Sequence, residues 1–201
     1  MMRIKDQKIR QFLDEISSIA PTPGGGAAAA LAGAMGAGLV TKVARLTIGK
    51  EKYKEVEEEF QGICKKAAGL MGDLLKLADE DVEAYQAVVT AHKEAKDFND
   101  LNHQSEKNEK TQKALKKAAE VPMETVRKSV EVLYLASFVT AKGNQNAVSD
   151  ARCAIELAIA AIYGALENVR INLTLIKDKK FVESLRNEID KILSEEKLKA
   201  G

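Results

Sequence analysis

The chain has 201 residues, of which 45% are hydrophobic and 30% are charged, and its formal net charge is +1. This composition is ordinary for a globular protein and excludes an intrinsically disordered chain. The balanced charge argues against a broad binding surface for nucleic acid or for an anionic membrane. Aromatic residues make up only 4%, with no tryptophan, which favours helices over strands. We therefore expect one all-α domain, residues 1–201, folded as an elongated up-and-down helical bundle.

The first two predicted helices differ sharply in composition. A short helix ends near Ile16, and its apolar residues are predicted to share one face. The run PTPGGG at 21–26 then breaks the chain and starts a helix over 27–47, in which alanine and glycine dominate. Glycine costs about 1 kcal/mol relative to alanine in a helix, so its frequency here indicates that another helix must approach closely. We expect this helix to be the most buried one and to lie at a subunit contact.

A long amphipathic helix is predicted from Lys52 to His92, with its apolar residues along one seam from Val56 to Val89. The polar stretch 95–106 is predicted to be an exposed, mobile loop. Helical character resumes near Thr111 and is expected to be interrupted at Pro122, because proline lacks an N–H donor.

The rest of the chain is also predicted to be helical. One helix covers 123–141 and stops at Gly143, and the next begins near Ser149. That second helix carries no charge between Glu156 and Glu167, so we expect it to be central to the core. A last amphipathic helix is predicted over 180–197.

Several features bear on location and redox state. The N-terminal residues are charged throughout, unlike a signal peptide, and the Ala/Gly-rich stretch 21–41 is too weakly hydrophobic for a membrane span. We therefore expect a cytoplasmic protein that does not enter the membrane. Cys64 and Cys153 have no CxxC partner and are predicted to be buried free thiols.

Two aspartates in the sequence ADEDVEAY (78–85) are the first candidates for chemistry. At about 100° per residue, Asp81 lies within the apolar arc of its helix, whereas Asp79 lies near the polar side. A carboxylate on the core seam either finds a partner or has its pKa raised, and raised carboxylates serve as general acids and bases near neutrality. The alternative is that Asp81 is simply neutralised by a Lys or Arg from another helix.

Three further groups of residues are candidates for ligand binding. Gly24, Gly25 and Gly26 start a helix, where free N–H groups can hold an anion, although a purely structural turn explains them equally. Arg45 and Lys50 flank the other end of that helix, where they can meet a carboxylate or only complement the helix dipole. The third group consists of polar residues near the ends of the uncharged helix, each of which can also be a helix cap: Asn144, Ser149, Asp150, Asn168 and Asn172.

Taken together and in order, these segments resemble a known family. The segments are PGGGAAAALAGA (23–34), LTIGK (46–50) with Tyr53, DEDVEAY (79–85), Gly143-Asn144 through Ser149-Asp150-Ala151, and NVRIN (168–172). The chain resembles, over residues 8–195, the cyclodeaminase domain of formiminotransferase-cyclodeaminase and the related bacterial methenyltetrahydrofolate cyclohydrolases. Ala27 departs from the pattern, because many relatives have serine after the glycines.

The resemblance implies an all-α homodimer or higher homo-oligomer that acts on a tetrahydrofolate derivative without a metal or other cofactor. It implies that the pair Asp79 and Asp81 lies in the catalytic segment, and that basic residues such as Lys50 hold the acidic tail of the folate. The expected reaction is cyclodeamination of 5-formiminotetrahydrofolate to 5,10-methenyltetrahydrofolate and ammonia. The alternatives are cyclohydrolysis of the methenyl compound to 10-formyltetrahydrofolate, or a non-catalytic helical module that only binds folate.

Overall fold

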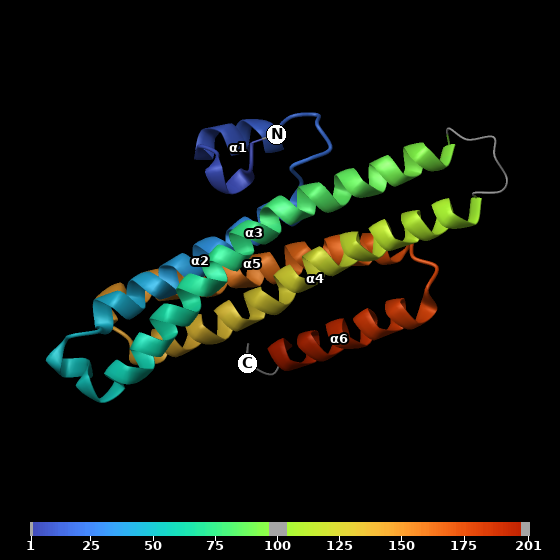
Figure 1. The fold of residues 1–201 in the computed structure, drawn as a ribbon. Coiled ribbons are helices and arrows are strands. Elements are labelled where there is room, and N and C mark those ends of the chain that lie inside the picture. The colour runs from blue at the N-terminus through green and yellow to red at the C-terminus, as the bar shows by residue number, and fades with distance from the viewer. Residues whose placement is uncertain (1, 97–103, 198–201) are drawn as a thin grey trace.

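The structure is a computed structural model that describes residues 2–96 and 104–197. Its core is an elongated bundle of four helices in up-and-down order: α2 (Gly25–Thr47), α3 (Glu57–Lys96), α4 (Gln104–Lys142) and α5 (Val148–Leu173). Figure 1 shows the four running side by side. Each contacts the next along the chain, and α5 closes the ring against α2. No strand occurs in the described ranges, so the prediction of an all-α bundle is confirmed.

Helix α2 packs closely against its neighbours because its residues are small. A Cβ atom added to Gly33 would lie 2.7 Å from the Ser129 hydroxyl of α4, and one added to Gly36 would lie 3.2 Å from the Ala154 carbonyl of α5. The prediction of a close helix contact is therefore correct, but the glycines make that contact within the chain. Of the described helices, α2 alone is long and apolar enough to cross a membrane, and 61% of its most apolar window is buried in the bundle.

Helix α4 continues through Pro122, so the predicted interruption there is wrong. Proline lacks an N–H, which leaves the carbonyl four residues earlier, that of Ala118, without its usual helical donor. The Asn172 side chain of α5 donates its amide N–H to this carbonyl at 2.7 Å. The neighbouring helix thus satisfies the group that the proline leaves unpaired, and the helix continues.

The long helices begin and end differently from the prediction. A short 3-10 helix, η2 (Glu51–Val56), precedes α3, which extends four residues beyond His92 to Lys96. Helix α4 begins at Gln104, so the edges of the predicted 95–106 loop are helical, and the rest of that loop lies outside the described residues. Another 3-10 turn, η4 (Gln145–Ala147), leads into α5.

Two outer segments cover the bundle. At the N-terminus, a 3-10 turn, η1 (Ile4–Asp6), packs against α3 and is followed by α1 (Ile9–Ile16), so the single predicted helix is split. Ile4 is buried, but Ile9 is 81% exposed, and the expected shared apolar face is therefore only partly formed.

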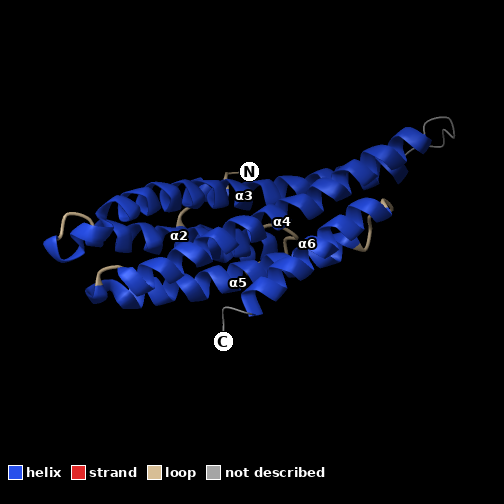
Figure 2. Cartoon of the chain, turned by 90° about the horizontal axis from the view of Figure 1, so that it is seen from below, coloured by secondary structure: helices blue, strands red, loops and turns tan. Residues whose placement is uncertain are grey.

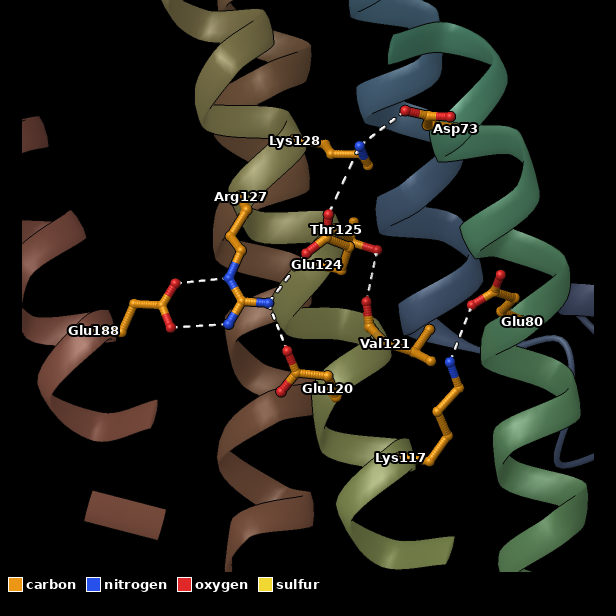
Figure 3. Close-up of polar contacts among 10 residues, drawn as sticks. All are labelled: Asp73, Glu80, Lys117, Glu120, Val121, Glu124, Thr125, Arg127, Lys128 and Glu188. Atoms are coloured by element: carbon orange, nitrogen blue, oxygen red, sulfur yellow. Dashed lines mark hydrogen bonds and ion pairs between the residues drawn. The ribbon is translucent and has the colours of Figure 1, made fainter. Parts of the chain in front are cut away.

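At the other terminus, α6 (Lys179–Lys197) lies alongside α4 and α5 (Figure 2). Charged side chains help to hold it there. Arg127 of α4 donates two hydrogen bonds to the Glu188 carboxylate of α6, at 2.7 and 2.9 Å, and also pairs with Glu120 and Glu124 of its own helix (Figure 3).

Some uncharged residues of α2 and α5 reach the surface. On α2, Met35 is 56% exposed and Ala28, Ala32 and Leu39 are partly exposed. On α5, Tyr163 is 50% exposed, so this helix is not buried on every side as its composition predicted. Cys153 is also exposed and only Cys64 is partly buried, which corrects the expectation of two buried thiols.

Candidate active site

Asp81 projects from α3 toward the N-terminus of α2, and the two helices meet there without any intervening side chain. A Cβ atom added to Gly26 would lie 2.1 Å from Asp81 Oδ1, so any residue other than glycine would collide with the carboxylate. The first turn of α2 has no side-chain cap of its own at Gly24. Asp81 of the neighbouring helix α3 caps this turn instead, because its carboxylate accepts a hydrogen bond from the Ala27 N–H.

Burial and hydrogen bonding act on Asp81 in opposite directions. Burial disfavours the ionised form and raises the pKa, whereas the Ala27 N–H stabilises the ionised form and lowers it. Burial dominates, and the pKa of Asp81 is raised from 3.8 to about 6. The alternative, a Lys or Arg partner for Asp81, is not found among the ion pairs of the described residues. A carboxyl group with this pKa can accept and return a proton near neutral pH.

Asp79 points to a different part of the molecule. Its carboxylate accepts a hydrogen bond of 2.6 Å from the Ile4 N–H, which ties the N-terminal segment to α3. Together with Glu83 and the N-terminal residues Gln7 and Glu15, it lines a cavity of about 180 Å³. Because 200° separates positions 79 and 81 around a helix, the two carboxylates do not form a pair. The catalytic role expected for Asp79 therefore stays a prediction, and it cannot depend on a shared proton with Asp81.

The structure brings only part of the predicted binding set to Asp81. The Gly24–Gly26 turn adjoins it directly, and Asn168 lies next to that turn, with its amide nitrogen 3.4 Å from a Cβ added to Gly25. Asn168 donates to the Gly164 carbonyl of its own helix, which leaves its amide oxygen for a ligand. Asn172 is one turn further along α5, but its amide is bonded to α4 beside Pro122.

The remaining candidates lie at the opposite end of α2. From Gly25 to Arg45 a helix rises about 30 Å, at 1.5 Å per residue. Arg45 and Lys50 are exposed there, at the end of α2 where the sequence places them, and their role in holding the folate tail stays a prediction. Asp150 pairs with Lys42 at 2.8 Å, and Ser149 is exposed in the first turn of α5.

Asn144 has structural contacts for both ends of its side chain. Its amide donates to the Leu46 carbonyl at 2.8 Å, and its oxygen accepts from the Asn146 N–H at 3.1 Å. Its backbone N–H donates to the Thr47 hydroxyl at 3.0 Å. Asn144 thus joins the start of α5 to the end of α2. It has the capping role that the sequence analysis gave as the alternative to ligand binding.

Two participants at the Asp81 end were not singled out from the sequence. The Ala27 N–H is a backbone group, and a sequence gives no signal for it beyond the glycine-rich helix start. Tyr85 falls within the apolar seam that the sequence predicts between Val56 and Val89, and it was therefore expected to be buried. Its side chain is instead 42% exposed, one turn beyond Asp81. In the described part of the chain, no group of three or more His, Cys, Asp or Glu residues is arranged to hold a metal ion.

Comparison with known proteins gives consistent results. The chain is 42% identical over 190 residues to methenyltetrahydrofolate cyclohydrolase of Methylorubrum extorquens, covering 94% of this chain and 90% of that protein. It is 30% identical to formimidoyltransferase-cyclodeaminase of Rattus norvegicus over 98% of its own length, and spans 36% of that longer protein. The crystal structure of formiminotetrahydrofolate cyclodeaminase from Thermotoga maritima superposes with a TM-score of 0.85, at 30% identity, over 95% of this chain and 90% of that one.

The family description also covers most of the sequence. Residues 8–191, which include all of the bundle and most of α6, match the family described as formiminotransferase-cyclodeaminase. The relative of 42% identity along nearly the whole of both chains, and the solved structure that shares the all-α bundle, agree with this match. The chain belongs to the formiminotransferase-cyclodeaminase family.

Proposed function

We propose that this chain is an enzyme of folate one-carbon metabolism, which catalyses addition and elimination at the carbon between N5 and N10 of tetrahydrofolate. Asp81 is the acid and base of the reaction. The observation that carries this proposal is the partly buried Asp81 carboxyl group, with a pKa of about 6, against the glycine start of α2. The substrate class follows from membership of the family and from the names of its relatives.

Cyclohydrolysis is the first candidate, supported by the 42% identity to a cyclohydrolase along nearly the whole of both chains. Water adds to the methenyl carbon of 5,10-methenyltetrahydrofolate, and ionised Asp81 takes a proton from it. The carbon–N5 bond then breaks while Asp81 returns the proton to N5, and the hydroxyl group on the carbon releases its proton to solvent as the formyl C=O forms. The product is 10-formyltetrahydrofolate, and one carboxylate serves first as base and then as acid.

Cyclodeamination is the second candidate, supported by the close structural match to a cyclodeaminase. In this reaction the formimino group of 5-formiminotetrahydrofolate enters protonated, and N10 adds to its carbon and loses a proton to Asp81. The proton then passes to the nitrogen that leaves as ammonia, and 5,10-methenyltetrahydrofolate remains. Both reactions use the same proton relay at the same carbon, so Asp81 alone does not distinguish them. Neither reaction requires a metal or a redox cofactor, and we propose that the enzyme uses none.

The enzyme is proposed to act as a homodimer in the cytoplasm. A partly exposed stripe on α2, made of Ala28, Ala32, Met35 and Leu39, offers an uncharged face on which a second copy can pack. Antiparallel pairing about a two-fold axis places the start of one α2 beside the end of the other. The partner subunit's Lys50 then lies near Asp81, where it can hold the acidic tail of the folate. Within one chain, these residues are separated by nearly the whole length of α2.

Direct assays of the purified protein test this proposal. The protein is incubated separately with 5,10-methenyltetrahydrofolate and with 5-formiminotetrahydrofolate, and the absorbance of the methenyl group is followed against blanks without enzyme. Loss of absorbance faster than the blank identifies a cyclohydrolase, and a gain from the formimino compound identifies a cyclodeaminase. No change with either substrate contradicts the proposal and supports the non-catalytic folate-binding module. Asp81→Asn serves as the matched inactive control.

A further inference from the structure

Tyr85 lies one helical turn from Asp81 on the same face of α3. Residues four apart on a helix are neighbours, about 5–6 Å apart at their Cβ atoms. Leu74 and Ala78 precede them on this face and are fully buried, whereas Tyr85 is 42% exposed. The face therefore passes from the core through Asp81 to an open aromatic ring.

The reason for this exposure is the point at which α2 begins. The two helices are antiparallel, since Gly33 of α2 approaches Leu74 while Gly26, earlier in α2, approaches Asp81. Residues of α3 beyond Asp81 therefore extend past the first turn of α2, which starts at Gly25. Tyr85 lies there, and among the described residues its hydroxyl has no hydrogen-bond partner.

The chemistry of the proposed substrate matches this position. The reacting carbon is bonded to N5 of the pterin and to N10, and N10 in turn carries the aminobenzoyl ring. When this carbon is within proton-transfer distance of Asp81, the aminobenzoyl ring is only one bond beyond N10. A tyrosine one turn from Asp81 is thus at the right separation to contact that ring, and tyrosine combines a flat apolar face with a polar tip.

We propose that Tyr85 positions the substrate by stacking on the aminobenzoyl ring, which holds the reacting carbon over Asp81. This inference rests on the proposed function. Because the contact is to a ring that does not change during the reaction, it stabilises the bound substrate and the transition state alike. Its loss therefore raises KM and leaves kcat nearly unchanged.

The experiment compares Tyr85→Phe, which keeps the ring, with Tyr85→Leu, which keeps an apolar side chain without it. With 5,10-methenyltetrahydrofolate or the formimino compound, whichever the parent converts, Tyr85→Leu should raise KM roughly threefold to tenfold. Tyr85→Phe should stay within twofold of the parent. Tyr134→Leu, which removes an exposed tyrosine from the far half of the bundle, is the control and should change neither constant.

Binding and assembly are measured alongside turnover. Calorimetric titration with tetrahydrofolate should show weaker binding to Tyr85→Leu by the same factor, and unchanged binding to Tyr134→Leu. The stacking role is overturned if Tyr85→Leu binds as well as the parent, if only kcat falls, or if the variant loses its oligomeric state. A parent protein that neither binds nor converts a folate contradicts the proposed function itself, which is a distinct result.

Discussion

Replacing Asp81 with asparagine should make the protein more stable at neutral pH, because it removes a carboxyl group whose ionised form burial disfavours. Asparagine has nearly the same shape and keeps an oxygen that can accept the Ala27 N–H, but it cannot ionise. In the folded parent the pKa of Asp81 is raised to about 6 from 3.8. The folded state therefore holds this proton more tightly than the unfolded chain does.

The sign and size of the effect follow from linkage. Between about pH 4 and pH 6 the unfolded chain has released the proton and the folded protein has not, so the free energy of unfolding falls as pH rises. A difference of about two pKa units corresponds to about 3 kcal/mol. Asp81→Asn should match the parent near pH 4 and exceed its free energy of unfolding by about 3 kcal/mol at pH 8.

Urea unfolding followed by circular dichroism from pH 4 to pH 8 measures this difference, at one protein concentration for both proteins. Glu188→Gln is the matched control with the opposite sign. Arg127 lowers the pKa of Glu188, so this bond contributes stability above the unfolded pKa and loses it as pH falls through the folded pKa. The free energy of unfolding of Glu188→Gln should be lower than that of the parent by up to about 1 kcal/mol at pH 7, and by less in acid. A gap between Asp81→Asn and the parent that does not widen with pH refutes the assigned burial of Asp81.

Three other predictions test the helix contacts and the dimer. Asn172→Leu should cost about 1–2 kcal/mol of unfolding free energy, and clearly less in a Pro122→Ala background, where the helix supplies its own N–H; equal costs in both backgrounds contradict the coupling. Met35→Glu, on the exposed stripe of α2, should convert a dimer into a folded monomer in light-scattering measurements, and a variant that remains dimeric shows that the stripe is not the interface. Lys50→Met should raise KM with little change in kcat, but should have no further effect in the Met35→Glu monomer, where the partner's residue is missing.

Much of the fold could be predicted from the sequence, because helix period and helix-ending residues are local properties. A glycine turn predicted the range of α2, 25–47, to within two residues. Polar residues at a helix start predicted the beginning of α5 equally well. The continuation of α4 through Pro122 could not be predicted in this way. It depends on Asn172, which is 54 residues away from Ala118 in sequence and lies beside it only in the folded bundle.

The candidate site was predicted in part. The apolar seam identified Asp81 rather than Asp79 as the carboxylate facing the core, because that argument requires only the helical period. The same argument wrongly predicted that Tyr85 is buried. Tyr85 is exposed because α2 no longer covers α3 beyond Asp81, and that point is set by the antiparallel packing of the two helices. The separation of about 30 Å between Arg45 and the glycine turn likewise follows from the length of α2. The motif resemblance groups residues by sequence order and carries no information about which end of the bundle they occupy.

The pH dependence of turnover tests the role of Asp81 most directly. Either reaction begins with the carboxylate ionised, so kcat/KM for the substrate that the parent converts should rise with pH through an apparent pKa near 6, that of the free enzyme, and then level off. Asp81→Asn should turn over about 10²- to 10⁴-fold more slowly, with normal folding and no inflection near pH 6. A folded Asp81→Asn protein that keeps near-parental kcat, or that retains the same inflection, contradicts the assignment of the proton relay to Asp81.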